Sequence, residues 1–180
     1  GLNPDSQQGD KVILDILKRC GGKFKPVEGA LHFDRSLLKA TEIDLADCPD
    51  LGPILFTLGC FCSGETVIRN AGRLRLKESD RIEAMQTELR KMGARIEVDG
   101  DTVHIQGVAL HAPNAPLSGH NDHRIVMALA VAAIASGLPA LLCGAEAVDK
   151  SWPAFWSVLR GLGAKVELNT DKQEEFDIKA

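Results

Sequence analysis

Residues 65–93 read ETVIRNAGRLRLKESDRIEAMQTELRKMG, a strand-like run that leads through a charged stretch into a helical one. Thr66, Val67 and Ile68 favour a strand over residues 65–70. The apolar residues at positions 82, 85, 89 and 92 share one face of a helix, and Gly93 is placed to end it. The pattern therefore predicts a strand, a polar connection and an amphipathic helix over residues 82–92.

The connection LKESDR at residues 76–81 has two interpretations. Ser79 or Asp80 can cap the helix through a side-chain oxygen. Arg81 then falls in the first turn, where the helix dipole disfavours a cation by roughly 0.3–1 kcal/mol. Either this is a solvated helix start whose Arg81 points away or pairs with Glu78, or an anion lies between Lys77, Arg81 and the free N–H groups.

The amphipathic helix and the hairpin that follows it recur along the chain. Leu17, Leu89 and Leu159 are equivalent, with spacings of 72 and 70 residues, and a glycine follows each by four residues. Helices are predicted from about residue 10 to 20, over 82–92 and over 155–162. Each is followed by two strand-like runs, at 23–27 and 30–33, at 95–98 and 102–106, and at 165–168 and 175–178.

A second pattern repeats between these segments. Asp50 precedes the apolar run 54–62, and Asp122 precedes the apolar run 125–135. A strand and then a lysine follow each run, at Lys77 and Lys150. A period this long indicates one supersecondary unit used repeatedly. A helix that is apolar all round must be buried, so we expect the two apolar helices in the middle of the fold.

The expected fold is therefore α/β, with mixed sheets around buried helices. Each unit holds an apolar helix, an amphipathic helix and about four strands. Residues 1–180 contain about two and a half such units, and residues 10–33 form only the second half of the first. We therefore expect the chain to be part of a longer repeat domain whose upstream portion is missing.

Composition excludes several classes of protein. The chain is 44% hydrophobic and 26% charged, with a net charge of −4, which argues against a nucleic-acid partner. No apolar run reaches the roughly 18 residues that cross a membrane. The five cysteines are scattered and lack zinc-site spacing, so we expect core thiols, no metal and a reducing cytoplasm. His120 and the pair Arg90–Lys91 show no ligand spacing and are predicted to be solvated surface.

Residues that bear chemistry gather at equivalent points of the repeat. Arg124, like Arg81, falls in the first turn of a helix, and two such cations indicate anion sites. The arginine fork suits carboxylate or phosphate. His123, Lys77 and Lys150 are expected nearby, which favours a ligand with more than one negative charge. Asp50 and Glu78 are then the acid/base candidates, although Asp50 and Asp122 could equally be ordinary helix caps.

The motifs LKESDR at 76–81 and NDHR at 121–124 together resemble the 5-enolpyruvylshikimate-3-phosphate synthase family, in its C-terminal part only. The matches extend to residues 8–10 (QGD), 49–50 (PD), 87–94 (TELRKMGA) and Lys150. The resemblance implies an inside-out α/β barrel of βαβαββ-type units, and a cytoplasmic enzyme of chorismate and aromatic amino acid synthesis. The segment GRLR at 72–75 departs from the asparagine-containing stretch of some members.

The resemblance also implies a reaction and roles. The enolpyruvyl group of phosphoenolpyruvate passes to the 5-hydroxyl of shikimate 3-phosphate with release of phosphate, through a tetrahedral intermediate and without metal or cofactor. Asp50 would hold and deprotonate the hydroxyl, helped by Lys77, and Glu78 would transfer a proton at the methylene carbon. Clamping of phosphoenolpyruvate would fall to Arg81, Arg124 and Lys150, with His123 lining the pocket. Glyphosate would compete there.

Two other functions stay open from the sequence. The chain could be a non-catalytic anion-binding or structural module that keeps the repeat fold. It could also belong with the sister UDP-N-acetylglucosamine enolpyruvyl transferases, although the two motifs speak against this. As a part of the synthase it would need the missing N-terminal domain as its partner, and we expect it to be inactive alone because both halves must hold the substrates.

Overall fold

The computed structural model describes residues 6–169 and 175–179, with side chains through residue 167. No helix in these ranges has both the length and the apolar character needed to cross a bilayer. The α-helices are α1 (Ile13–Arg19), α2 (Gly52–Phe61), α3 (Arg81–Lys91), α4 (His123–Ser136) and α5 (Phe155–Gly161). The strands are β1 (Lys23–Val27), β2 (Ala30–Asp34), β3 (Glu42–Asp44), β4 (Glu65–Arg69), β5 (Arg95–Asp99), β6 (Thr102–Gln106), β7 (Leu117–Ser118), β8 (Ala140–Cys143), β9 (Lys165–Asn169) and β10 (Glu175–Lys179). Short 3-10 turns η1 (Gly9–Val12), η2 (Pro49–Leu51), η3 (Ala71–Leu76) and η4 (Ala145–Lys150) join them.

The two four-stranded sheets have the same topology. Their strand orders are β3-β4-β6-β5 and β7-β8-β10-β9. In each sheet the first pair is parallel and the other two pairs are antiparallel. Each sheet thus belongs to one unit that runs strand, apolar helix, strand, amphipathic helix, hairpin, and the predicted βαβαββ repeat is confirmed for both full units.

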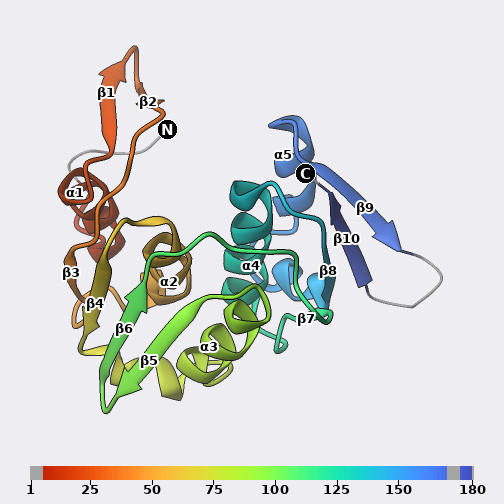
Figure 1. Cartoon of the computed structure of the whole chain (residues 1–180). Helices are drawn as coiled ribbons and strands as arrows, with labels where there is room; N and C mark the ends of the chain where they lie inside the picture. Colours follow the sequence, from red (N-terminus) through yellow and green to blue (C-terminus); the bar gives the residue numbers. More distant parts are fainter. Residues whose placement is uncertain (1–5, 170–174, 180) are drawn as a thin grey trace.

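The two apolar helices lie side by side at the centre, as expected. In Figure 1, α2 and α4 stand between the sheet of β3 to β6 and the sheet of β7 to β10. Leu55 and Phe56 on α2 and Ile125 and Leu129 on α4 are fully buried. One polar contact joins the helices, since the Thr57 hydroxyl donates to the carbonyl of Ala128 at 3.1 Å. Burial on all sides explains why these two segments lack an amphipathic pattern.

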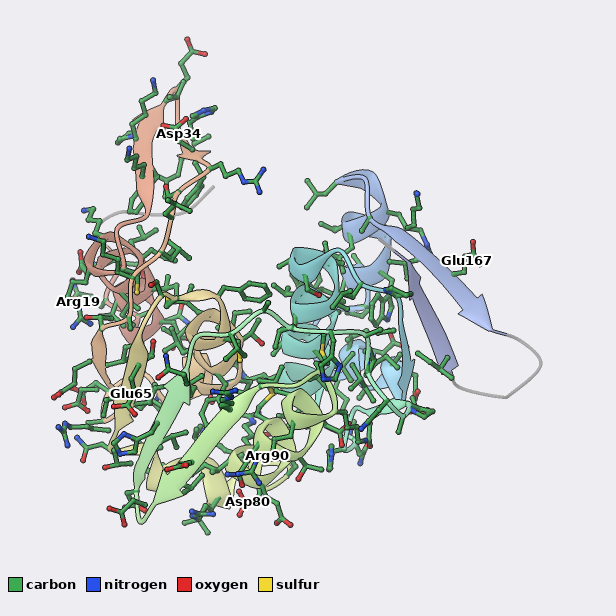
Figure 2. The ribbon with its side chains drawn as sticks, in the orientation of Figure 1. Arg19, Asp34, Glu65, Asp80, Arg90 and Glu167 are labelled. Atoms are coloured by element: carbon green, nitrogen blue, oxygen red, sulfur yellow. The ribbon has the colours of Figure 1, made fainter. Side chains whose placement is uncertain are left out.

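The predicted half-unit consists of α1 and the hairpin of β1 and β2. The hairpin projects from the rest of the molecule (Figure 1), and Asp34, labelled in Figure 2, is the last residue of β2. Phe24 and Phe33 pack against each other across its strands, with ring centroids 5.0 Å apart. Phe33 is nevertheless 53% exposed, whereas Val103 and Ile105 in the equivalent strand β6 are fully buried. Within the described residues, the half-unit therefore has no counterpart of the central helix that covers β6.

Two long cationic side chains, at equivalent positions of the repeat, join neighbouring units. Arg19 on α1 donates to the carbonyl of Glu42 in β3 at 2.8 Å. Lys91, 72 residues later on α3, donates to the carbonyl of Pro116 just before β7 at 2.9 Å. Arg90 is exposed, in agreement with the predicted solvated face, although it also bonds the carbonyl of Ile96 at 2.6 Å, whereas Lys91 is partly buried. Each amphipathic helix that precedes a full unit is thus tied to that unit's first strand.

The cysteines are free thiols, as predicted. Those at 20, 48, 60 and 62 are buried, and Cys143 is partly buried. Burial raises the pKa of the Cys60 and Cys62 thiols to about 12. These two side chains are therefore protonated core residues rather than nucleophiles at neutral pH.

The end of β6 approaches the end of α2 so closely that only glycine fits at position 107. A Cβ atom there would lie 1.7 Å from the carbonyl oxygen of Cys62. We expect Gly107→Ala to lower the free energy of unfolding by about 1–3 kcal/mol, the usual cost of overpacking. Urea denaturation measures this. Gly161→Ala is the matched control: a Cβ there meets no atom within 4 Å, so stability should hold or rise by up to about 1 kcal/mol. Equal effects of the two changes would contradict the close approach.

Candidate functional site

The candidate residues meet where three helices begin. Asp50 lies in η2, which leads into α2, while Arg81 begins α3 and His123 begins α4. Lys77 and Glu78 come from the connection that precedes α3. The repeat places the starts of α2 and α4 in equivalent positions, so packing of α2 on α4 brings their first turns together. In Figure 2 the labelled Asp80 marks the start of α3.

Asp50 is the centre of the cluster. Its Oδ1 atom lies 3.0 Å from the Lys77 ammonium and 3.1 Å from Nη1 of Arg81. Arg124 makes two hydrogen bonds to the same residue. Its Nη2 atom donates to Oδ2 at 3.1 Å, and its Nη1 atom donates to the backbone carbonyl at 3.0 Å. Asp50 makes no capping bond to α2. Asp50 is therefore not an ordinary helix cap, and its role in a site stays a prediction.

The Arg81 side chain is a buried hub, by which we mean that it is shielded from solvent and bonded to several carboxylates. It is 1% exposed, and its Nε atom donates to Oδ2 of Asp122 at 2.8 Å. Its Nη2 atom donates to Glu78 at 2.6 Å and its Nη1 atom to Asp50 at 3.1 Å. All three nitrogens of the guanidinium thus contact carboxylates. The predicted pairing with Glu78 is present, but the solvated helix start is wrong because this cation is buried.

Asp122 is a further candidate residue, which the sequence predicts only as a possible helix cap. It does cap α4, accepting from the N–H of Arg124 at 2.9 Å. Its carboxylate is fully buried and also accepts from Arg81 and, at 3.1 Å, from the Ser79 hydroxyl. The cap of α3 is Asp80, which leaves Ser79 for this contact. The sequence signals were the position of Asp122 inside the NDHR motif and its equivalence to Asp50 in the repeat.

Neighbouring charges hold the carboxylates of Asp50 and Asp122 ionised. Burial alone would raise the pKa of Asp50, but the hydrogen bond from Lys77 and the charges of Arg124, Lys77 and Arg81 outweigh it and leave that pKa below the usual range. Burial opposes ionisation of Asp122 in the same way, and the bonds from Arg81 and from the N–H of Arg124 again leave its pKa lowered. Both groups therefore act as hydrogen-bond acceptors at neutral pH.

Lys150 and His123 lie around the start of α4. The Lys150 ammonium donates to the backbone carbonyl of Asn121 at 2.6 Å and to the side-chain oxygen of the same residue. Asn121 has a left-handed backbone, with φ of 54°, and precedes the cap Asp122. His123 is 9% exposed, and its Nδ1 atom has no hydrogen-bond partner within the described part of the chain.

The two arginines of the GRLR segment serve as tethers. Arg73 donates to the carbonyl of Ala46 at 3.1 Å. Arg75 lies 3.2 Å from the carboxylate of Asp80 and donates to the carbonyl of Gly100 at 3.3 Å. These bonds fix η3 between the segment before α2, the start of α3 and the β5–β6 turn. They orient the cluster without belonging to it.

The assembled site holds four cations and three carboxylates. In the described residues no three histidine, cysteine or acidic side chains gather as a metal site would require. Carboxylates hold Lys77, Arg81 and Arg124 in place, and the N-termini of α3 and α4 add positive potential, which suits a multiply anionic ligand. Binding such a ligand requires some cations to exchange a carboxylate partner for it. Asp50 and Glu78 are the two more exposed carboxylates of the cluster, and they are placed to accept or donate protons.

Comparison with known proteins gives a consistent result. A family model described as EPSP synthase (3-phosphoshikimate 1-carboxyvinyltransferase) matches residues 1–159. Proteins named 3-phosphoshikimate 1-carboxyvinyltransferase from Clostridium acetobutylicum and Methanocaldococcus jannaschii are 45% and 40% identical over 92% and 93% of this chain. The chain spans 38% and 39% of the length of these two relatives. A solved EPSP synthase from Acinetobacter baumannii matches with a TM-score of 0.75 at 28% identity, over 89% of this chain and 40% of its own. The predicted fold class is confirmed.

Proposed function

The chain belongs to the EPSP synthase family, and from this premise we propose that it is the C-terminal part of an enzyme that transfers the enolpyruvyl group of phosphoenolpyruvate to the 5-hydroxyl of shikimate 3-phosphate. The observation that carries the proposal is the contact of Asp50 with three cations, Lys77, Arg81 and Arg124, where three helices begin. A transferase of two phosphorylated substrates needs such a cluster, with carboxylates among the cations for proton transfer.

Phosphoenolpyruvate is the ligand that we assign to the cations. Arg124 is partly exposed, and a carboxylate or phosphate can replace its partner Asp50. Lys150 is exposed and uses two of the three N–H donors of its ammonium on Asn121, which leaves the third for the ligand. Arg81 is held by three carboxylates, of which Glu78 is the most exposed. Arg81 joins the clamp when Glu78 turns away toward the methylene carbon. His123, whose Nδ1 atom has no partner among the described residues, lines the same pocket.

The reaction then proceeds by addition and elimination. The 5-hydroxyl oxygen forms a bond to C2 of phosphoenolpyruvate, its proton passes to Asp50, and Glu78 gives a proton to the methylene carbon. In the second half, phosphate leaves C2 with the proton held by Asp50, and the Glu78 carboxylate takes a proton back from the methyl group, which forms the enol ether of the product. Lys77, 3.0 Å from Asp50, supplies positive charge next to the hydroxyl. The low pKa of Asp50 keeps it ionised and ready to accept the hydroxyl hydrogen bond.

Substrate-dependent phosphate release tests the proposal. It is measured on this chain and on the chain extended to the length of its relatives, with and without shikimate 3-phosphate. We expect release only by the longer protein and only with both substrates, because each substrate must be held in place for reaction. Arg124→Ala should lower release about tenfold or more at a concentration of phosphoenolpyruvate below its KM, whereas Arg35→Ala, an exposed arginine outside the cluster, should not. A folded longer protein that releases no phosphate, or whose Arg124→Ala variant keeps full activity, would favour a non-catalytic anion-binding module.

A further inference from the structure

Glu88 on α3 is a second buried carboxylate, about two helical turns beyond Arg81. Glu88 is 1% exposed, and it receives hydrogen bonds from three directions. Its Oε2 atom accepts from the Lys91 ammonium at 2.7 Å and from the backbone N–H of Ser118 at 2.8 Å. Its Oε1 atom lies 2.9 Å from Nε2 of His120. A buried carboxylate with this many partners is costly to assemble, so a function for the contact is worth seeking.

These contacts bind α3 of one unit to the segment that begins the next. Ser118 belongs to β7, and His120 lies in the turn between β7 and α4. Lys91 extends the same attachment to the carbonyl of Pro116. His120 is an exposed residue, as predicted, but its side chain has a buried partner. Its side chain is 33% exposed and reaches back to α3 across a sequence separation of 32 residues.

The turn that Glu88 holds has an unusual backbone. His120 and Asn121 both have left-handed conformations, with φ of 50° and 54°. Two consecutive residues of this kind cost of order 1–3 kcal/mol each unless the surroundings impose them. The second of them, Asn121, presents both its backbone and its side-chain oxygen to the Lys150 ammonium. The next residue, Asp122, caps α4 and holds Arg81.

We propose that Glu88 is a positioning residue: by holding His120, it imposes the left-handed turn in which Asn121 fixes the ammonium of Lys150. Glu88 does not contact the cluster itself. Its carboxylate acts through the imidazole of His120 and the adjacent peptide to set the two oxygens of Asn121. The binding of phosphoenolpyruvate by Lys150 rests on the proposed function. The chain of contacts from Glu88 to Lys150 is independent of it.

Two substitutions of His120 separate the contact from the backbone conformation. His120→Asn keeps a residue that tolerates the left-handed region but is too short to reach Glu88. His120→Gln places an amide N–H near the position of Nε2 and can still donate to the buried carboxylate. Glu88→Gln removes the charge, and Glu83→Gln is its matched control, because Glu83 is an exposed carboxylate on the same helix. The two His120 variants keep the test valid if Glu88→Gln fails to fold.

Acetylation of Lys150 by a small amine-reactive ester, read by mass spectrometry in this chain, measures the tether without any activity. Lys18, an exposed lysine, is the internal reference. We expect His120→Asn and Glu88→Gln to raise the labelling of Lys150 about tenfold, the effect of losing hydrogen bonds to a charged group. His120→Gln and Glu83→Gln should stay within about twofold of the parent, as surface changes do. Labelling unchanged in His120→Asn, or raised equally in His120→Gln, would overturn the proposal.

Kinetics of the longer protein distinguish the tether from the proposed function. His120→Asn should raise the KM for phosphoenolpyruvate by about ten- to a hundredfold, the effect of a small misplacement of a binding group. The KM for shikimate 3-phosphate should stay nearly constant. Raised labelling of Lys150 without a change in the KM for phosphoenolpyruvate would support the tether and overturn the assignment of Lys150 to that substrate.

Discussion

Arg81→Met should lower the free energy of unfolding by about 3–5 kcal/mol, since removing one partner of a buried ion pair leaves the other charge uncompensated. The residue left behind is Asp122, which is fully buried and loses its 2.8 Å bond from Arg81 Nε. Methionine fills most of the volume, so the loss measures charge rather than a cavity. Urea denaturation of the parent and the variant at pH 7 gives the difference.

A matched control and a double variant isolate the buried charge. Arg75→Met removes an arginine paired with Asp80 at a side chain 39% exposed, and should cost less than about 1 kcal/mol. Arg81→Met combined with Asp122→Ser removes both charges and keeps an N-cap for α4. The double variant should therefore be more stable than Arg81→Met alone. Equal stability of the single and double variants would contradict the assignment of the loss to the unpaired carboxylate.

The difference in the free energy of unfolding between the parent and Arg81→Met should change with pH in a definite direction. The pKa of Asp122 is lowered in the folded chain, so its stabilising contribution is present above its unfolded pKa of about 3.9 and is lost as pH falls through the folded value. In Arg81→Met the same carboxylate is unpaired, and protonation relieves the cost of burying it. The gap between parent and variant should therefore narrow below about pH 4. A gap independent of pH would contradict the ion-pair explanation.

Asp50→Asn in the longer protein should lower kcat by about 10²–10⁴-fold, the contribution of a positioned proton acceptor. It should not weaken phosphoenolpyruvate binding. Asp50 occupies Lys77, Arg81 and Arg124 in the structure, so an anionic ligand competes with it for the last of these cations. Removing its negative charge leaves the cations more available. The expected result is a large fall in kcat with an unchanged or lower KM for phosphoenolpyruvate.

Arg124→Ala provides the contrast, because it removes a cation and keeps the acceptor. Its KM for phosphoenolpyruvate should rise about tenfold or more, as loss of a charge-assisted hydrogen bond predicts. Asp47→Asn, a nearby exposed carboxylate, should leave both constants unchanged. If Asp50→Asn raised the KM for phosphoenolpyruvate as strongly as Arg124→Ala, Asp50 would be supporting the cations rather than accepting a proton.

Much of the fold could be predicted because its signals are local or periodic. The run of apolar residues in the helix after Arg81, with Asp80 before it and Gly93 after it, predicts α3 to within a residue at each end. The 72-residue spacing of Leu17 and Leu89 predicts that two segments share one structure without saying how strands pair. Start positions were less accurate where the signal was weak. The first helix was expected from about residue 10, but residues 9–12 form a 3-10 turn and α1 begins at Ile13.

The site could be predicted only as a set of residues. Asp50, Lys77, Arg81 and Arg124 were chosen from helix-start chemistry and family resemblance, and the structure does bring them into contact. Which charge neutralises which was not accessible, because the pairs that Asp50 makes join residues 27 to 74 positions apart. Glu88 and His120 were missed for the same reason. Each looks like an ordinary polar residue on its own segment.

The sequence by itself determined the repeat, the order of the elements and the buried character of α2 and α4, and it narrowed the cap of α3 to Ser79 or Asp80. Those properties depend on the spacing of apolar side chains and on hydrogen bonds that close within one turn of the chain. Only the tertiary structure decided that Arg81 is a buried hub, that Asp50 bonds cations instead of capping α2, and that Glu88 holds the turn before α4. Pairing of charges depends on which helix ends meet, and packing of the two central helices sets that meeting.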